Sequence, residues 1–170
     1  MKKIFLIILI VGNLFSQNFP YFDGNRAFEY LVKQCDLGPR YPGSKGHADF
    51  IKMLDQYLTP FNLLVVKHEV TVTNPITQRP VDLTNFLVRF SPKKQKRLLI
   101  LAHWDTREIA DKDPILANQD NPILGANDGA SGIAILMELV NILFNNPLIN
   151  IGVDLLFVDG EDMGVSGGAE

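Results

Sequence analysis

The pattern of hydrophobic and polar positions predicts two helices in the first third of the chain. Apolar residues recur at helical spacing over residues 23–36, which begin with an aspartate that can cap a helix, and again over residues 45–58. Residues 37–44 between them are dense in Gly and Pro, which indicates a loop. Pro60 ends the second helix.

The next segments have the patterns of strands. Residues 63–73 are rich in Val and Leu, and residues 81–90 alternate apolar and polar positions. The connection between them is short, so the two are predicted to form an antiparallel hairpin. Residues 97–102 are a continuous apolar run, which is typical of a strand buried on both faces in a partly parallel sheet.

A strand–helix–strand unit is predicted in the second half. Residues 130–144 form a helix that is apolar over most of its circumference, and residues 153–158 form another buried strand. A long polar loop, residues 106–124, separates the strand at 97–102 from this helix, and such loops are often functional. The chain is therefore predicted to be α/β, with no repeats and no second domain.

This unit predicts a site at one edge of the sheet. The helix runs antiparallel to both strands, so the start of the helix and the ends of the strands lie together. Several carboxylates there repel one another unless a positive charge neutralises them, and the start of a helix supplies only about half a charge. A bound divalent cation is the simplest source of the missing positive charge. A mixture of His and Asp ligands suits zinc. The residues placed at this edge are His103, Asp105, Asp128, Glu161 and Asp162.

Each of these residues alone has an ordinary structural explanation. Asp128 could be a helix cap with no other role, and His103 could be a hydrogen-bonded histidine at a strand end. Glu161-Asp162 could be an ordinary acidic turn. Their combination and their order along the chain indicate a metal site with an acid/base beside it. The other histidines, predicted to be structural and away from the site, are His47 and His68.

Composition and charge narrow the class of protein. The 170 residues suffice for one domain, and 46% hydrophobic with 21% charged residues is ordinary for a globular protein. The net charge is −3 with one short basic run at residues 93–97, so nucleic acid is not expected as a partner. Cys35 is the only cysteine, which excludes an internal disulfide, and a buried inert thiol is expected.

Residues 1–16 are predicted to be a secretory signal. Two lysines precede an apolar run and a polar end. The run is shorter than the roughly 20 residues of a membrane span, so no stable span is expected. The protein is predicted to be exported, to the periplasm or the cell exterior, unless an uncleaved signal tethers it to the membrane.

The motifs resemble those of the zinc-dependent M28 peptidase family, which includes aminopeptidases and the animal-type glutaminyl cyclases. The matching segments are His103-Trp104-Asp105, residues 125–132 around Asp128, Asp159-Gly160-Glu161-Asp162 and the loop at residues 38–44. The resemblance covers residues from about 25 to 170. It implies a three-layer α/β/α fold with a mixed, mostly parallel sheet, and residues 17–170 as the N-terminal portion of a single domain.

The resemblance also implies roles for the site residues. Asp128 and Asp162 would bind zinc, and Glu161 would be the general acid/base. The motifs resemble bacterial glutaminyl cyclases more than aminopeptidases; a cyclase would bind one zinc ion and an aminopeptidase two. Either enzyme would act on the N-termini of peptides or proteins. The remaining expectations are Trp104 as a substrate contact, and His103 and Asp105 as ligands of a second metal or supports of the first.

The family's third ligand of the main zinc is a histidine far downstream, and no histidine follows His103 in this chain. We therefore expect a fragment of a longer protein that is poorly stable and inactive alone. The alternative outside enzymes is a family-like domain that has lost its metal and serves as a binding ectodomain. The intact Asp128, Glu161 and Asp162 argue against that alternative.

Overall fold

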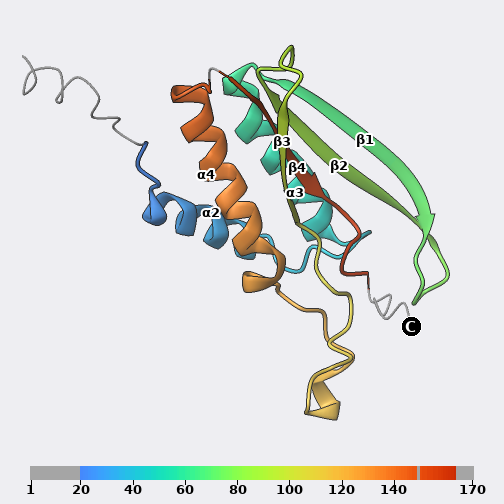
Figure 1. Ribbon diagram of the computed structural model, residues 1–170. Helices are drawn as coiled ribbons and strands as arrows, with labels where there is room; N and C mark the ends of the chain where they lie inside the picture. The colour runs from blue at the N-terminus through green and yellow to red at the C-terminus, as the bar shows by residue number, and fades with distance from the viewer. Residues whose placement is uncertain (1–19, 149, 164–170) are drawn as a thin grey trace, which may run out of the picture.

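The computed structural model of the protein describes residues 20–148 and 150–163, so the signal predicted at residues 1–16 lies outside the described residues. Four strands form one sheet in the order β1-β2-β4-β3 (Figure 1). β1 and β2 form the predicted antiparallel hairpin, β2 is also antiparallel to β4, and β3 and β4 are parallel. The strands are β1 Leu64–Thr73, β2 Pro80–Phe90, β3 Arg97–His103 and β4 Gly152–Val158.

The α/β fold with a mixed sheet is confirmed, but the described strands are not mostly parallel. Short connections explain the difference. Residues 74–79 and 91–96 are too few to cross over a sheet, so β1, β2 and β3 alternate in direction. The helix α4 (Gly132–Asn145) is long enough for a crossover, and it returns the chain so that β4 lies parallel to β3.

The two helices before the sheet are α2 (Gly24–Asp36) and α3 (Lys45–Leu58). The Asp23 side chain caps α2 by accepting a hydrogen bond from the amide of Arg26 (3.0 Å). Ser44 caps α3 in the same way through the amide of His47 (3.0 Å). These caps place both helix starts within one residue of the prediction. Short 3₁₀ turns follow at Thr59–Phe61 and Leu116–Asn118.

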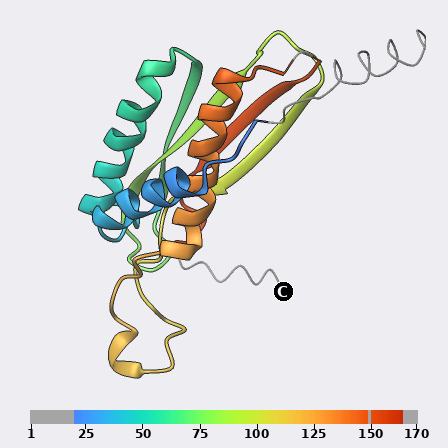
Figure 2. The same ribbon diagram turned by 90° about the vertical axis from the view of Figure 1, so that its left-hand side faces the viewer.

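The three helices of the described residues lie on one face of the sheet, and Figure 2 views the molecule from that side. The core fills the space between them and includes Phe50, Leu54, Phe86, Val88, Ile133, Val140, Leu155 and Phe157. The opposite face of the sheet carries exposed apolar side chains, among them Leu99 (53%) and Leu101 (58%). These two leucines belong to β3. The prediction that the strand at residues 97–102 is buried on both faces is therefore wrong for the described residues. They form two layers, and the expected third layer is not among them.

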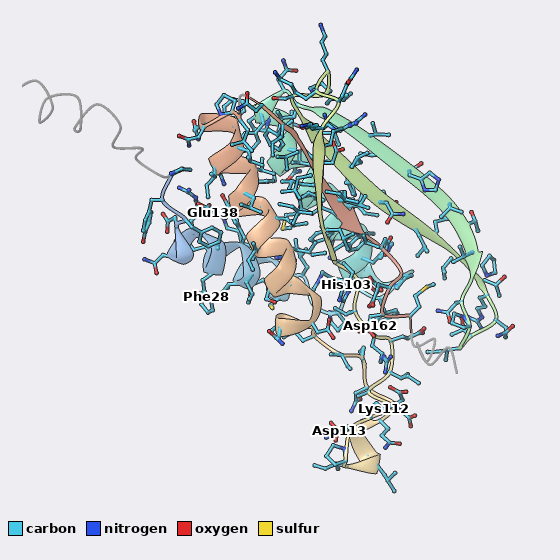
Figure 3. All side chains as sticks on the ribbon, in the orientation of Figure 1. Phe28, His103, Lys112, Asp113, Glu138 and Asp162 are labelled. Atoms are coloured by element: carbon cyan, nitrogen blue, oxygen red, sulfur yellow. The ribbon has the colours of Figure 1, made fainter. Side chains whose placement is uncertain are left out.

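α4 with the turn before it, Ala126–Asn145, is long and apolar enough by length and composition to cross a membrane. Its contacts are nevertheless those of a core helix. Ile133 and Val140 are fully buried. Glu138, marked in Figure 3, is also buried and accepts two hydrogen bonds from Arg26 of α2 (2.7 and 2.6 Å). That bidentate pair fastens α2 to α4.

Candidate active site

The ends of three elements meet at one edge of the sheet, the lower end in Figure 1. His103 is the last residue of β3, and Asp128 lies in the Ala126–Ser131 turn that leads into α4. Glu161 and Asp162 lie in the turn that begins at Asp159, directly after β4. Because β3 and β4 are parallel neighbours, with His103 opposite Val158, both strands end at the same level. The structure thus brings together the residues that the sequence placed at this edge.

His103 lies at the centre of the cluster. Its Nε2 is 2.7 Å from Asp128 Oδ1 and 3.8 Å from Glu161 Oε2, and its Nδ1 is 3.5 Å from Asp105 Oδ1. The interaction with Asp105, followed by those with Asp128 and Glu161, raises the pKa of His103 to about 9. The Asp128 and Glu161 side chains are 75% and 63% exposed. Their carboxylates therefore face solvent, where a substrate can reach them.

Asp105 holds the acidic turn after β4. Its side chain is fully buried, and its two carboxylate oxygens accept hydrogen bonds from the amides of Glu161 (3.1 Å) and Asp162 (2.8 Å). A buried carboxylate that is satisfied by backbone amides orients the chain that carries them. Asp105 was expected either to bind a second metal or to support the residues around the first, and this geometry favours the supporting role.

Arg107, a residue without a predicted role, contacts the predicted zinc ligand Asp162. Its Nε is 2.9 Å from Asp162 Oδ1, and its Nη1 is 2.7 Å from Asp111 Oδ1. Burial raises the pKa of Asp162 above its ordinary value, and Asp105 and Asp128 add to this, while Arg107 opposes it. The polar loop 106–124 extends away from the sheet beyond this pair, as Lys112 and Asp113 mark in Figure 3.

Trp104 does not have the position expected of a substrate contact. Its side chain is fully buried, and the indole Nε1 donates a hydrogen bond to the carbonyl of Thr84 (3.2 Å). Successive side chains along a strand point to opposite faces, so Trp104 turns into the core while its neighbours turn to the site. The expectation of substrate contact is therefore corrected: the ring presents no surface to a ligand.

Arg40 is a residue whose importance the hydrophobic pattern does not indicate. It lies in the Gly- and Pro-rich loop, yet it is fully buried, and its amide donates to Thr106 Oγ1 (2.8 Å). Burial lowers the pKa of its guanidinium below the ordinary value. The guanidinium donates to backbone carbonyls on three segments, so it fastens the loop that precedes Asp128 to the end of β3. The acceptors are the carbonyl oxygens of Gln34, Gly38, Trp104, Leu124 and Gly125.

His47 is a second residue with an unexpected place. It was predicted to lie away from the site, but its ring contacts Asp159, the first residue of the acidic turn (2.8 Å). A sequence signal exists: His47 shares the apolar face of α3 with Phe50, Leu54 and Leu58. A histidine on the buried face of a helix needs a polar partner.

Zinc fits the donor chemistry of this cluster. Asp128 and Asp162 offer carboxylate oxygens, which bind zinc. The like charges that raise the pKa of Asp162 are those that a divalent cation would neutralise. Within residues 20–148 and 150–163, no three His, Cys, Asp or Glu side chains are grouped as ligands of one ion. A complete site would take a further ligand from another part of the protein.

The fold is that of zinc exopeptidase-like α/β proteins. A Zn-dependent exopeptidase from Parabacteroides distasonis superposes with a TM-score of 0.80 at 32% identity, over 85% of this chain and 49% of that one. The profile of Peptidase family M28 matches residues 85–170. The chain belongs to this family.

Two further relatives are, by name, a glutaminyl cyclase and a glutaminyl-peptide cyclotransferase-like protein. The glutaminyl cyclase of Bacteroides thetaiotaomicron has a TM-score of 0.82 at 35% identity, over 90% of this chain and 52% of that one. A glutaminyl-peptide cyclotransferase-like protein of Mus musculus is 28% identical in an alignment 131 residues long, and this match covers 72% of this chain and 32% of the mouse protein. The chain thus spans about half the length of the solved structures and about a third of the mouse relative.

Proposed function

We propose that this chain belongs to a zinc-dependent glutaminyl-peptide cyclotransferase, which converts the N-terminal glutamine of peptides or proteins to pyroglutamate and releases ammonia. The observation that carries the proposal is the position of Glu161. Its carboxylate is exposed at the sheet edge, 3.8 Å from His103 Nε2 and in one cluster with Asp128. Similarity to a bacterial glutaminyl cyclase at 35% identity supports cyclisation as the reaction.

The reaction needs a group that moves a proton between two nitrogens. The α-amine of the substrate attacks the γ-carbonyl carbon, which forms the new C–N bond, and the bond from that carbon to the amide nitrogen breaks. Glu161 takes a proton from the α-amine and gives it to the departing nitrogen, which leaves as ammonia. The amide of Glu161 is held by the buried Asp105, so the carboxylate stays at the edge where the substrate enters.

Asp128 and Asp162 are the residues that would hold zinc, together with a ligand from outside the described residues. One zinc ion bound there would supply a Lewis acid for the γ-carbonyl oxygen of the substrate. His103 would orient Asp128 through its 2.7 Å contact, and Asp105 would orient Asp162 through the backbone amide.

The proposed substrates also suit the predicted export of the protein. Residues 1–16 have the composition of a secretory signal, and exported peptides and proteins expose new N-termini when their own signals are removed. We therefore propose that the enzyme acts in the periplasm or outside the cell, or tethered to the membrane if the signal is not cleaved.

A zinc aminopeptidase is the second candidate. His103 Nε2 lies beside Asp128, so the two could share a second metal ion, and the similar Parabacteroides protein is an exopeptidase by name. In that reaction Glu161 would take a proton from the water that attacks the first peptide bond. Assays of the full-length protein separate the two. A cyclase releases ammonia from peptides with N-terminal Gln and leaves leucine anilides intact, whereas an aminopeptidase hydrolyses the anilide.

Replacing Glu161 tests the proposed proton transfer. Glu161→Gln keeps the size of the side chain but removes the base, so turnover should fall by about 100- to 10,000-fold. Zinc content, measured by mass spectrometry, should not change, because Glu161 is not a proposed ligand. The matched control is Glu29→Gln on the exposed surface of α2, which should leave turnover unchanged. Retained activity in Glu161→Gln would remove this residue from the mechanism, and a protein without zinc would favour the binding ectodomain.

A further inference from the structure

His47 reaches the acidic turn from a helix that is distant in sequence. It lies in the first turn of α3 and is only 5% exposed. Its Nε2 is 2.8 Å from Asp159 Oδ2. Since Asp159 begins the turn that carries Glu161, one side chain connects α3 to the proposed proton carrier.

The Asp159 carboxylate has few other partners. Oδ2 also accepts a hydrogen bond from the amide of Thr84 (2.7 Å), and Oδ1 has no partner among the described residues. Burial raises the pKa of Asp159, which reflects the cost of holding this carboxylate away from water. In the described part of the chain, His47 is the only side chain that bonds to it. Without His47, the buried group would keep a single backbone donor.

The position of Asp159 determines where Glu161 lies. Gly160 follows with φ +79°, and a Cβ at this position would lie 2.6 Å from the side chain of Leu83. The turn therefore fits closely against β2. Beyond Gly160, the amides of the two following acids bind Asp105. The turn is thus held through two buried carboxylates, and His47 bonds to the first of them.

His47 also contacts the other half of the site. Its ring packs against Trp104 with the centroids 4.5 Å apart and the planes at 33°. Trp104 in turn stacks on Phe50, also at 4.5 Å. Because Trp104 lies between His103 and Asp105 in the chain, His47 contacts two of the three segments that form the cluster.

We propose that His47 is a positioning residue: its hydrogen bond to Asp159 fixes the acidic turn so that Glu161 is held beside His103. The effect on turnover rests on the proposed function, whereas the effect on the turn does not. The hydrogen bond rather than the ring carries the effect, because it acts on the turn itself. A different side chain that donates to Asp159 should therefore restore it.

Variants of the full-length protein separate the bond from the ring. His47→Phe keeps an aromatic ring against Trp104 and removes the donor, whereas His47→Gln keeps a donor and removes the ring. We expect His47→Phe to lower kcat by about 10- to 100-fold with KM within about 3-fold. His47→Gln should stay within about 3-fold of the natural protein in both constants, as should the control His68→Gln on exposed β1.

Hydrogen exchange tests the positioning without any activity. In His47→Phe the amides of Glu161 and Asp162 should exchange at least about tenfold faster, while that of Val140 in α4 should not change. If the natural protein neither cyclises nor hydrolyses, the proposed function fails and this measurement still decides the role of His47.

Three results would overturn the proposal. The first two are an unchanged kcat and unchanged exchange in a folded His47→Phe variant. The third is equal loss in His47→Phe and His47→Gln, which would assign the effect to ring packing. If His47→Phe does not fold, His47→Asn replaces it, since its amide is too short to reach Asp159.

Discussion

Two aspartates, one in β4 and one directly after it, have surroundings that shift their pKa values in opposite directions. Asp154 in β4 is bound by Arg97 (2.6 and 2.7 Å) and by Arg89 (3.0 Å), and these arginines, Arg97 first, lower its pKa to about 2. Asp159 is buried with one histidine and one amide, and its pKa is raised. The first carboxylate stabilises the fold by its charge. The second is kept near the site at a cost to stability.

The Asp154 cluster predicts a stability that depends on pH. The folded pKa lies below the ordinary value of 3.8, so the contribution is full above that value and is lost as the pH falls toward 2. Allowing for screening by solvent, Asp154→Asn should lower the free energy of unfolding by about 1–2 kcal/mol at pH 7 and by about half as much at pH 3. Urea titrations at the two pH values measure this. An equal loss at both would mean that packing, not charge, is responsible, and Asp120→Asn in the exposed loop is the control.

The acids at the sheet edge could be predicted from the sequence because chain connectivity alone brings their backbones together. Two residues that support them from distant parts of the chain, Arg40 and His47, could not. His47 and Asp159 are 112 positions apart, and nothing local to either indicates the other. Trp104 was misplaced for a related reason: adjacency to two site residues says nothing about which face a side chain takes. Side-chain direction was decided by packing against α3.

At the scale of elements, the turn that leads into α4 approaches the end of β3 very closely. A Cβ at Gly129 would lie 2.2 Å from the carbonyl oxygen of His103 and 2.8 Å from its ring. Periodicity predicted the helix itself well, but α4 begins after residue 130, because Ala126–Ser131 forms a separate turn in which Asp128 is not helical (φ −111°, ψ 104°). That turn is shaped by contact with β3, which no local pattern records.

Gly129→Ala tests this close approach. The added methyl group has no room, so the turn must move away from β3, and the variant should lose about 1–3 kcal/mol of unfolding free energy. Because the turn carries Asp128, turnover of the full-length protein should fall as well. The matched control is Gly24→Ala at the start of α2, where no atom lies within 4 Å of the added Cβ. A Gly129→Ala protein as stable as Gly24→Ala, by thermal unfolding, would contradict the geometry.

The whole molecule is asymmetric about its sheet. Among the described residues, three helices cover one face, whereas the sheet exposes apolar side chains on its two edge strands, β1 and β3. The continuous apolar run at residues 97–102 correctly predicted a strand, and it also predicted burial on both faces. Only one face is covered by the described residues. The sequence of a strand shows that both of its faces are apolar, but it does not show what packs against each face.

The uncovered face makes a prediction about the behaviour of the chain in solution. Contiguous exposed apolar surface promotes association and binds hydrophobic dyes, so the purified 170-residue chain should bind anilinonaphthalene sulfonate and self-associate. Replacing Leu99 and Leu101 together by Thr keeps side chains that suit a strand. This change should reduce dye fluorescence by about half or more and shift the chain toward monomer in sedimentation. Ile135→Thr, an exposed apolar residue on α4, is the matched control and should change neither. Unchanged dye binding in the double variant would mean that association depends on another surface, since these two leucines are the most exposed apolar side chains of the sheet.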